Sequence, residues 1–321
     1  MISEKSTFAL FFGNRGFFPG SLISSAREEM SGVLKRMGHK VIMLDEKLTR
    51  FGAVETPAEG MKYAEFLSCN RGRFDGVILS LPNFGDENGT IAALRDCGVP
   101  ILIQAYPDEL DKMGPQFRRD AFCGKFSIMN LFCQHGLPFT VISPHTVRPK
   151  DERFCGHVDY FDRLCRVVKA MRRMRVGAVG ARTTPFKTVR IDESALEEHG
   201  ITTETFDLSY VFSKIEGVKI SDKPFKKKSA SLKDYSNWQG VPRSSFEKLV
   251  RLAVVFDSMI EENGLDAIAV RCWDEMQRFV GISPCVVLSE INNRGIPAAC
   301  EVDVGNAVTM FALGKAAGSP V

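Results

Sequence analysis

The chain has 321 residues, of which 44% are hydrophobic and 25% charged, a composition typical of a globular protein with room for two domains. Its formal charge of +3 is spread along the whole sequence, which argues against a surface for nucleic acid or anionic lipid. No apolar run approaches the roughly 18 residues of a membrane span, and the run from Phe8 to Phe12 is too short for a signal peptide. We therefore expect a cytoplasmic protein without nucleic-acid or membrane partners.

Residues 1–160 are predicted to form an N-terminal α/β domain. Apolar residues from Leu22 to Met37 recur at helical spacing, and Ser21 is placed to cap the start of that helix. Short continuous apolar runs predict strands at Phe8–Phe12, Val41–Leu44, Val77–Leu81, Ile101–Ile103 and Phe139–Ile142. Continuous runs are typical of strands that are covered on both faces, so we expect a doubly wound parallel sheet.

Residues 161–321 are predicted to repeat this organisation as a second Rossmann-like domain. A connecting helix is expected at 161–175, and an apolar stripe from Leu249 to Ile260 predicts a long helix that ends near Gly264. The serine and proline at 283–284 are typical of a helix start. Strands are expected at 176–179, 267–270 and 298–302. We interpret the basic run Lys226–Lys228 as a solvated loop between two elements.

The segment Pro297–Asp303 is the most informative for function. Its small residues predict a strand, and Glu301 lies at the carboxyl end of that strand, where open α/β sheets bind their ligands. Asp303 is favoured as the cap of the following helix rather than as a second functional carboxylate. A carboxylate in this place suits Mn²⁺ or Mg²⁺, although one carboxylate cannot fill about six coordination positions.

Two further loops follow predicted strands of the first domain. Arg15, in Gly13–Pro19, is a candidate for holding sugar hydroxyls or a partner subunit's carboxylate, and the alternative is an ordinary surface arginine. The acidic pair in Asn83–Asn88 either contacts a polyol or caps the next helix, and capping is favoured. The glycines of Gly177–Arg182 superficially suggest a dinucleotide fingerprint, but their spacing is wrong, and a tight turn suffices.

The chain resembles the L-fucose isomerase-like family in five short runs that span its whole length. These runs occur in the family's order, at Gly13–Pro19, Gln104–Met113, Arg118–Lys125, Gly177–Arg182 and Ala299–Asp303. The resemblance implies two Rossmann-like domains followed by a C-terminal domain, dependence on Mn²⁺ or another divalent cation, and aldose–ketose isomerisation through an ene-diol.

The resemblance also implies roles for individual residues. Glu301 matches the family's catalytic and metal-binding glutamate. Arg15 looks like the arginine that reaches a sugar in a neighbouring subunit's site, which implies a homo-oligomer. Trp273 follows a strand of the second domain where the family lines its pocket, and its ring either stacks on a sugar or packs in the core.

The sequence departs from the family pattern at its end. The family's second acidic ligand and its histidine fall beyond Val321, so we expect a C-terminally truncated form that lacks the C-terminal domain and the remaining metal ligands. The predicted function is an aldose–ketose isomerase acting on a free sugar of the L-fucose/D-arabinose type. The alternative is a non-catalytic sugar-binding protein with two Rossmann-like lobes.

Overall fold

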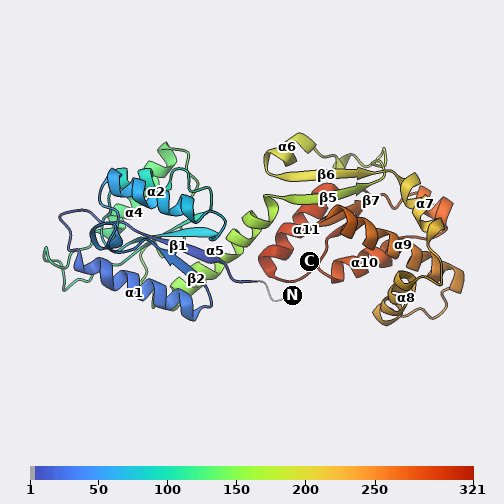
Figure 1. The fold of residues 1–321 in the computed structure, drawn as a ribbon, viewed down its shortest axis with the longest axis horizontal. Helices are drawn as coiled ribbons and strands as arrows, with labels where there is room; N and C mark the ends of the chain where they lie inside the picture. Colours follow the sequence, from blue (N-terminus) through green and yellow to red (C-terminus); the bar gives the residue numbers. More distant parts are fainter. Residues whose placement is uncertain (1–3) are drawn as a thin grey trace. The chain divides into compact units, whose positions relative to one another are not determined.

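Two four-stranded parallel sheets organise the chain, which the computed structural model describes from residue 4 to residue 321. The chain divides into two compact units, the first ending at Val168 and the second running from Lys169 to Val321. Each unit has helices on both faces of its sheet (Figure 1), which confirms the predicted pair of Rossmann-like α/β lobes. The boundary predicted at residues 160 and 161 lies within helix α5 (Glu152–Met171), the helix that joins the two units.

The first sheet has the strand order β2-β1-β3-β4. Its strands are β1 (Thr7–Phe12), β2 (Lys40–Met43), β3 (Gly76–Leu81) and β4 (Ile101–Ala105). Helices α1 (Ser21–Arg36) and α5 cover one face, where Phe8, Leu10 and Phe12 are buried. The other face, with Ala9 and Phe11, is covered by α2 (Pro57–Cys69), α3 (Glu87–Leu94) and α4 (Ala121–Gln134). Alternate residues of one strand therefore enter two different cores, as a continuous apolar run predicts.

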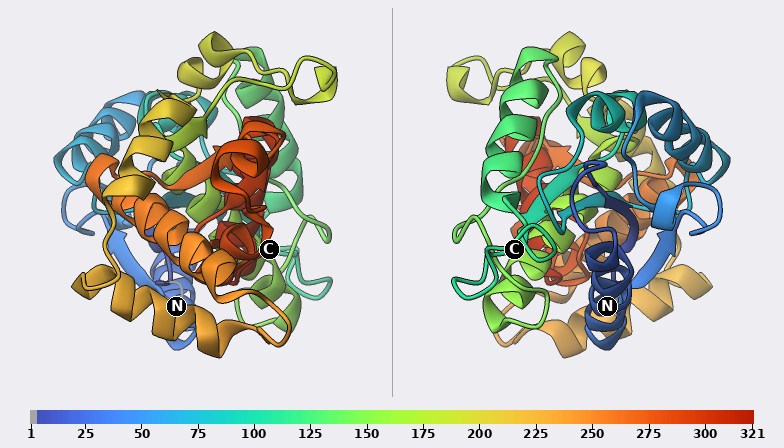
Figure 2. Two further views of the ribbon diagram at one scale, coloured as in Figure 1. Left: turned by 90° about the vertical axis from the view of Figure 1, so that its right-hand side faces the viewer. Right: turned by 90° about the vertical axis from the view of Figure 1, so that its left-hand side faces the viewer.

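The second sheet repeats this order as β6-β5-β7-β8. Its strands are β5 (Met174–Val179), β6 (Ile201–Phe206), β7 (Ala267–Val270) and β8 (Ala298–Cys300). One face packs against α6 (Glu193–Glu198) and α11 (Val304–Ala317). The other face is covered by α7 (Leu208–Gly217), α8 (Lys223–Tyr235), α9 (Arg243–Asn263) and α10 (Cys285–Asn293). Helices α8 and α9 lie side by side, as the left view of Figure 2 shows.

Three short helical turns complete the secondary structure of residues 4–321, at η1 (Arg50–Gly52), η2 (Lys187–Val189) and η3 (Met276–Val280). Across residues 4–321, no helix combines the length and the apolar character that crossing a bilayer demands.

Some predicted element ends and caps are wrong. The strand predicted at 139–142 is reduced to one bridge, between Thr140 and Leu102, because Pro138 and Pro144 flank it and prolines interrupt a hydrogen-bonded ladder. Ser21 is the first residue of α1 rather than its cap, since Gly20 takes the N-cap position. Helix α10 likewise has Pro284 at its N-cap and no side-chain cap.

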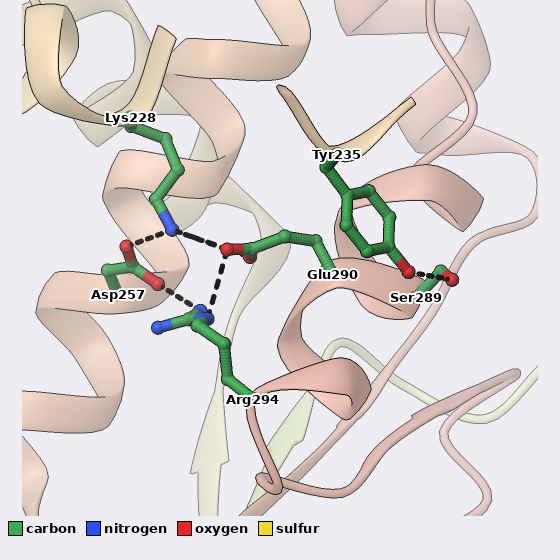
Figure 3. Close-up of polar contacts among 6 residues, drawn as sticks. All are labelled: Lys228, Tyr235, Asp257, Ser289, Glu290 and Arg294. Carbon is green, nitrogen blue, oxygen red and sulfur yellow. Dashed lines mark hydrogen bonds and ion pairs between the residues drawn. The ribbon is translucent and has the colours of Figure 1, made fainter. Parts of the chain in front are cut away.

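The basic run at Lys226–Lys228 is not a loop but the middle of α8, so its interpretation as a solvated loop is wrong. Phe225, Lys228 and Leu232 recur at helical spacing and form the buried face of this helix. The Nζ of Lys228 lies 2.6 Å from Asp257 Oδ2 on α9 and 3.2 Å from Glu290 Oε1 on α10. Arg294 contacts the same two carboxylates and closes a four-residue ion network (Figure 3).

Candidate functional site

Each sheet has a point where the strand order reverses, between β1 and β3 in the first unit and between β5 and β7 in the second. In open parallel sheets, ligands bind beyond the carboxyl ends of the strands at this point. The loops Gly13–Pro19 and Asn83–Asn88 occupy it in the first unit. In the second unit it is formed by the segments after Val179 and Val270, with Glu301 beyond the next strand, β8.

Glu301 lies on a strained piece of backbone. Strand β8 ends at Cys300, and the next two residues, Glu301 and Val302, have φ angles of 61° and 58°. Left-handed backbone disfavours side chains that branch at Cβ, and each such residue costs about 1–3 kcal/mol. The Val302 amide donates to Val270 O at 3.3 Å, and its side chain is buried in the core under α11. The sheet and core therefore hold the turn, which ends the strand two residues earlier than predicted.

The Glu301 carboxylate is open to a ligand. Among residues 4–321, no hydrogen bond or ion pair engages it. The carboxylates that follow β7 are engaged, since Glu275 pairs with Arg271 and Asp274 pairs with Arg278. Asp303 accepts a hydrogen bond from the Asn306 amide at 2.8 Å, which confirms its predicted role as the cap of α11. The backbone thus holds Glu301 in place, while its side chain makes no hydrogen bond or ion pair within residues 4–321.

Trp273 lies beyond β7, the strand next to β8. Its side chain is 49% exposed. Its ring packs edge-on against the Phe186 ring, with the two ring centroids 5.5 Å apart. The Arg271 guanidinium donates to Trp273 O at 2.8 Å and to Ala181 O at 3.2 Å. Arg271 thereby ties the segments after β5 and β7 together, a role that sequence reasoning missed. Glu301 and Trp273 accordingly follow adjacent strands, at the same edge of the second sheet.

Arg15 belongs to the first unit and packs on the loop after β3. Its Nε donates to Gly85 O at 2.9 Å, its Nη2 lies 3.6 Å from Glu87 Oε2, and its guanidinium carbon lies 4.3 Å above the Phe84 ring centroid. Asp86 caps α3 through the Gly89 amide, as predicted. The guanidinium is therefore fixed in one orientation at the carboxyl edge of the first sheet.

A buried polar network lies beneath Arg15, and sequence reasoning missed it. The side chains of Asn14 and Asn83 are fully buried and hydrogen-bonded to each other. Asn14 also donates to Glu55, and Asn83 accepts from the Gly85 amide. A signal was available, because an asparagine follows each of two neighbouring strands by two residues. Buried amides that satisfy one another hold both loops in a single arrangement.

The residues around Glu301 do not form a metal site by themselves. No group of three or more His, Cys, Asp and Glu side chains within residues 4–321 has a geometry that holds a metal. Partial burial raises the pKa of the neighbouring Cys300 thiol, and Cys272 and Glu301 raise it further, so this sulfur stays protonated near neutral pH. The described residues at this strand end therefore offer a cation the Glu301 carboxylate.

Comparisons with known proteins identify the chain's family. A family model described as the fucose/sulfoquinovose isomerase N-terminal domain matches residues 9–172, half of the chain. The chain is 24% identical over 256 residues to a sulfoquinovose isomerase of Priestia aryabhattai, a match covering 79% of this chain and 56% of that protein. It is 25% identical over 173 residues to a sulfoquinovose isomerase of Clostridium sp. (strain MSTE9), covering 54% and 38%. The chain thus spans about half the length of the curated relatives it matches.

Among solved structures, a periplasmic solute binding protein of Actinobacillus succinogenes 130z with bound D-allose aligns at 13% identity. The alignment covers 99% of this chain and 93% of that chain, with a TM-score of 0.25.

Proposed function

Because the chain belongs to the fucose/sulfoquinovose isomerase family, we propose that it interconverts an aldose and a ketose, with Glu301 as the group that moves the proton. One observation carries the assignment: Glu301 presents an unengaged carboxylate on strained, held backbone at the carboxyl edge of the second sheet. Strained backbone of this kind clusters at functional sites, because the surrounding structure must compensate its cost.

The proposed chemistry needs one base that works twice. The Glu301 carboxylate accepts the proton from C2 of the open-chain aldose, and an ene-diol forms as the carbonyl oxygen takes up a proton. The resulting carboxylic acid then returns its proton to C1 while the C2 hydroxyl gives up its proton to water, which replaces the one that the carbonyl oxygen took up, and the ketose forms without net change in atoms or charge. A carboxylate that is tied to no other side chain suits this shuttle, because it is free to alternate between accepting and donating.

We further propose Mn²⁺ or another divalent cation as the cofactor, with Glu301 as one of its oxygen ligands. The described residues form no metal cluster by themselves, so Glu301 is the one ligand of the cation that we assign. Such a cation supplies Lewis acidity toward the sugar oxygens. Retention of Mn²⁺ after gel filtration, measured for wild type and Glu301→Gln, tests this assignment without any turnover.

The proposed substrate is a free sugar. The sequence motifs favour the L-fucose/D-arabinose type, whereas the matched relatives are named for sulfoquinovose, a sugar that bears a sulfonate. We also propose a cytoplasmic homo-oligomer in which Arg15 serves a neighbouring copy's site, and sedimentation of the wild-type chain tests the assembly. A monomer at all concentrations would exclude that role for Arg15.

Deuterium exchange tests the isomerase directly. The chain is incubated with Mn²⁺ in D₂O, with L-fucose, D-arabinose or sulfoquinovose, and deuterium entering the sugar's C2 is followed by NMR. Wild type is expected to exchange at least one of these sugars and Glu301→Gln none. Asp303→Asn is the matched control, because asparagine caps a helix as well as aspartate does and exchange should persist.

Two outcomes overturn the proposal. One is a wild-type chain that exchanges none of the three sugars, and the other is a Glu301→Gln variant that exchanges as fast as wild type. Sugar binding by calorimetry without any exchange would establish the alternative, a non-catalytic sugar-binding protein.

A further inference from the structure

We propose that Arg182 is an anion-binding residue of the second unit, and that it holds a sulfonate or phosphate substituent of the sugar whose carbonyl end lies at Glu301. The inference rests on the proposed function for the position of the reacting carbons. It goes beyond that function by assigning a residue to a charged substituent, and so by naming a class of substrate.

The guanidinium of Arg182 is anchored on one side and open on the other. Its Nη1 donates to Thr184 O at 3.0 Å, to Thr183 O at 3.2 Å and to Phe186 O at 3.3 Å. Within the described chain, no protein acceptor engages its Nε or Nη2. These two nitrogens form the edge with which a guanidinium binds an oxyanion through two parallel hydrogen bonds. Arg182 therefore presents a fixed and unused donor pair.

The charge of Arg182 is also unneutralised. Arg271, the other arginine at this strand-order reversal, pairs with Glu275 at 2.8 Å, whereas no carboxylate pairs with Arg182 in residues 4–321. The segment 182–190 adds Lys187 and Arg190 and contains no acidic residue. Two arginines thus lie at one edge of one sheet, and only one of them has a protein counter-ion. A half-buried cation without a counter-ion favours an anionic ligand.

The position of Arg182 fits a substituent at the far end of the same sugar. Arg182 follows β5 and Glu301 follows β8, with only β7 between these strands, so the strand ends lie about 10 Å apart, two interstrand spacings. Five carbon–carbon bonds of a hexose span about 6 Å. The Phe186 carbonyl accepts from Arg182, and the Phe186 ring contacts the ring of Trp273. The half-exposed Trp273 side chain is therefore linked to Arg182 through Phe186, and both lie at the sheet edge that carries Glu301.

Equilibrium binding to a charged sugar and to its neutral counterpart tests the assignment. Calorimetry of the whole chain compares sulfoquinovose with quinovose, the same sugar without the sulfonate, and uses methanesulfonate to probe the ion alone. Wild type is expected to bind sulfoquinovose at least about tenfold tighter, as the energy of a hydrogen bond to a charged group implies. Arg182→Gln should bind both sugars equally, with the quinovose affinity unchanged.

Two further variants separate recognition from loop support. Arg190→Gln removes an exposed charge of the same segment, whose Nε donates to Lys187 O at 2.9 Å, and should keep the preference for the charged sugar. Arg182→Lys keeps the charge but loses the donor pair, so an intermediate preference is expected. If Arg182→Gln weakens both sugars equally, or if wild type does not distinguish them, the proposal is overturned and Arg182 only braces its own loop.

The result is independent of catalysis. A chain that binds sulfoquinovose through Arg182 but exchanges no deuterium would retain this inference and overturn the isomerase. A chain that exchanges neutral and charged sugars alike, with Arg182→Gln unaffected, would retain the isomerase proposal and overturn this inference.

Discussion

Lys228 and Glu290 form an ion pair in which the side chains are only 9% and 4% exposed, and it joins helix α8 to helix α10. Asp257 and Arg294 complete the network, so each charge meets two of opposite sign (Figure 3). Burial of a charge is tolerated when it is paired in this way. Lys228, one residue of the basic run, thus braces the helical layer over the second sheet from inside.

Lys228→Ala should lower the free energy of unfolding by about 3 kcal/mol, because it leaves the buried Glu290 carboxylate without its Lys228 partner. Lys227→Ala, one residue earlier on the exposed side of α8, should change it by less than about 0.5 kcal/mol. Urea unfolding followed by circular dichroism measures both. Equal effects of the two substitutions would show that the buried network contributes nothing.

Glu301→Gly should stabilise the protein by about 1 kcal/mol while abolishing deuterium exchange, because glycine adopts the observed φ of 61° without strain. Glu301→Gln keeps a side chain there and should leave stability nearly unchanged. Thermal and urea unfolding of the three proteins provide the comparison. A destabilised glycine variant would contradict strain at this residue.

Gly124→Ala should destabilise the first unit by about 2 kcal/mol, because the new methyl group would overlap the backbone of Phe84, on which Arg15 packs. Gly156→Ala is the matched control on α5, where an added methyl group meets nothing. That variant should be stabilised by about 0.5–1 kcal/mol. Urea unfolding measures both, and a Gly124→Ala variant as stable as wild type would contradict the close approach of α4 to this loop.

Lys125→Met should alter how stability depends on pH. Burial lowers the pKa of Lys125 to about 8, and its Nζ donates to His145 O at 2.9 Å. Between pH 8 and the ordinary lysine pKa near 10.4, the unfolded chain binds the proton more tightly, so this group makes wild type more stable as pH rises. Below pH 8 the amine is charged in both states, and the folded state bears its burial cost.

The variant should therefore be more stable than wild type at pH 7, by about 2 kcal/mol once the lost hydrogen bond is counted. This advantage should shrink as pH rises from 8 to 10. Urea unfolding at pH 7, 8, 9 and 10 measures the difference, with Lys227→Met as a control for an exposed lysine. A difference that stays constant across this range would contradict the lowered pKa.

The buried strands were predictable because their signal is local. Strand β7 has the predicted bounds, and β1 and β3 differ by one residue at one end, since an unbroken apolar run reports burial on both faces. Strand β6 was not predicted. It lies at the sheet edge, where Thr202 and Thr205 are exposed and the polar residues between Ile201 and Phe206 weaken the apolar signal.

The candidate site was predictable in part. The position of Glu301 directly after a strand was predictable because a run of small residues precedes it, and the Asp303 and Asp86 caps follow from the same local rules. The free edge of Arg182 was not predictable, since it depends on which carbonyls surround that side chain.

The sequence by itself determined the α/β class, most strand positions, the family and the carboxylate at the end of β8, because apolar periodicity and short motifs act over a few neighbouring residues. Only the tertiary structure decided which charges are paired. Lys228 meets a partner 62 residues away, Arg271 bonds a carbonyl 90 residues away, and Arg182 meets no carboxylate in the described chain. Charge pairing depends on distances of a few ångströms between segments that folding alone brings together, and the order of residues does not encode those distances locally.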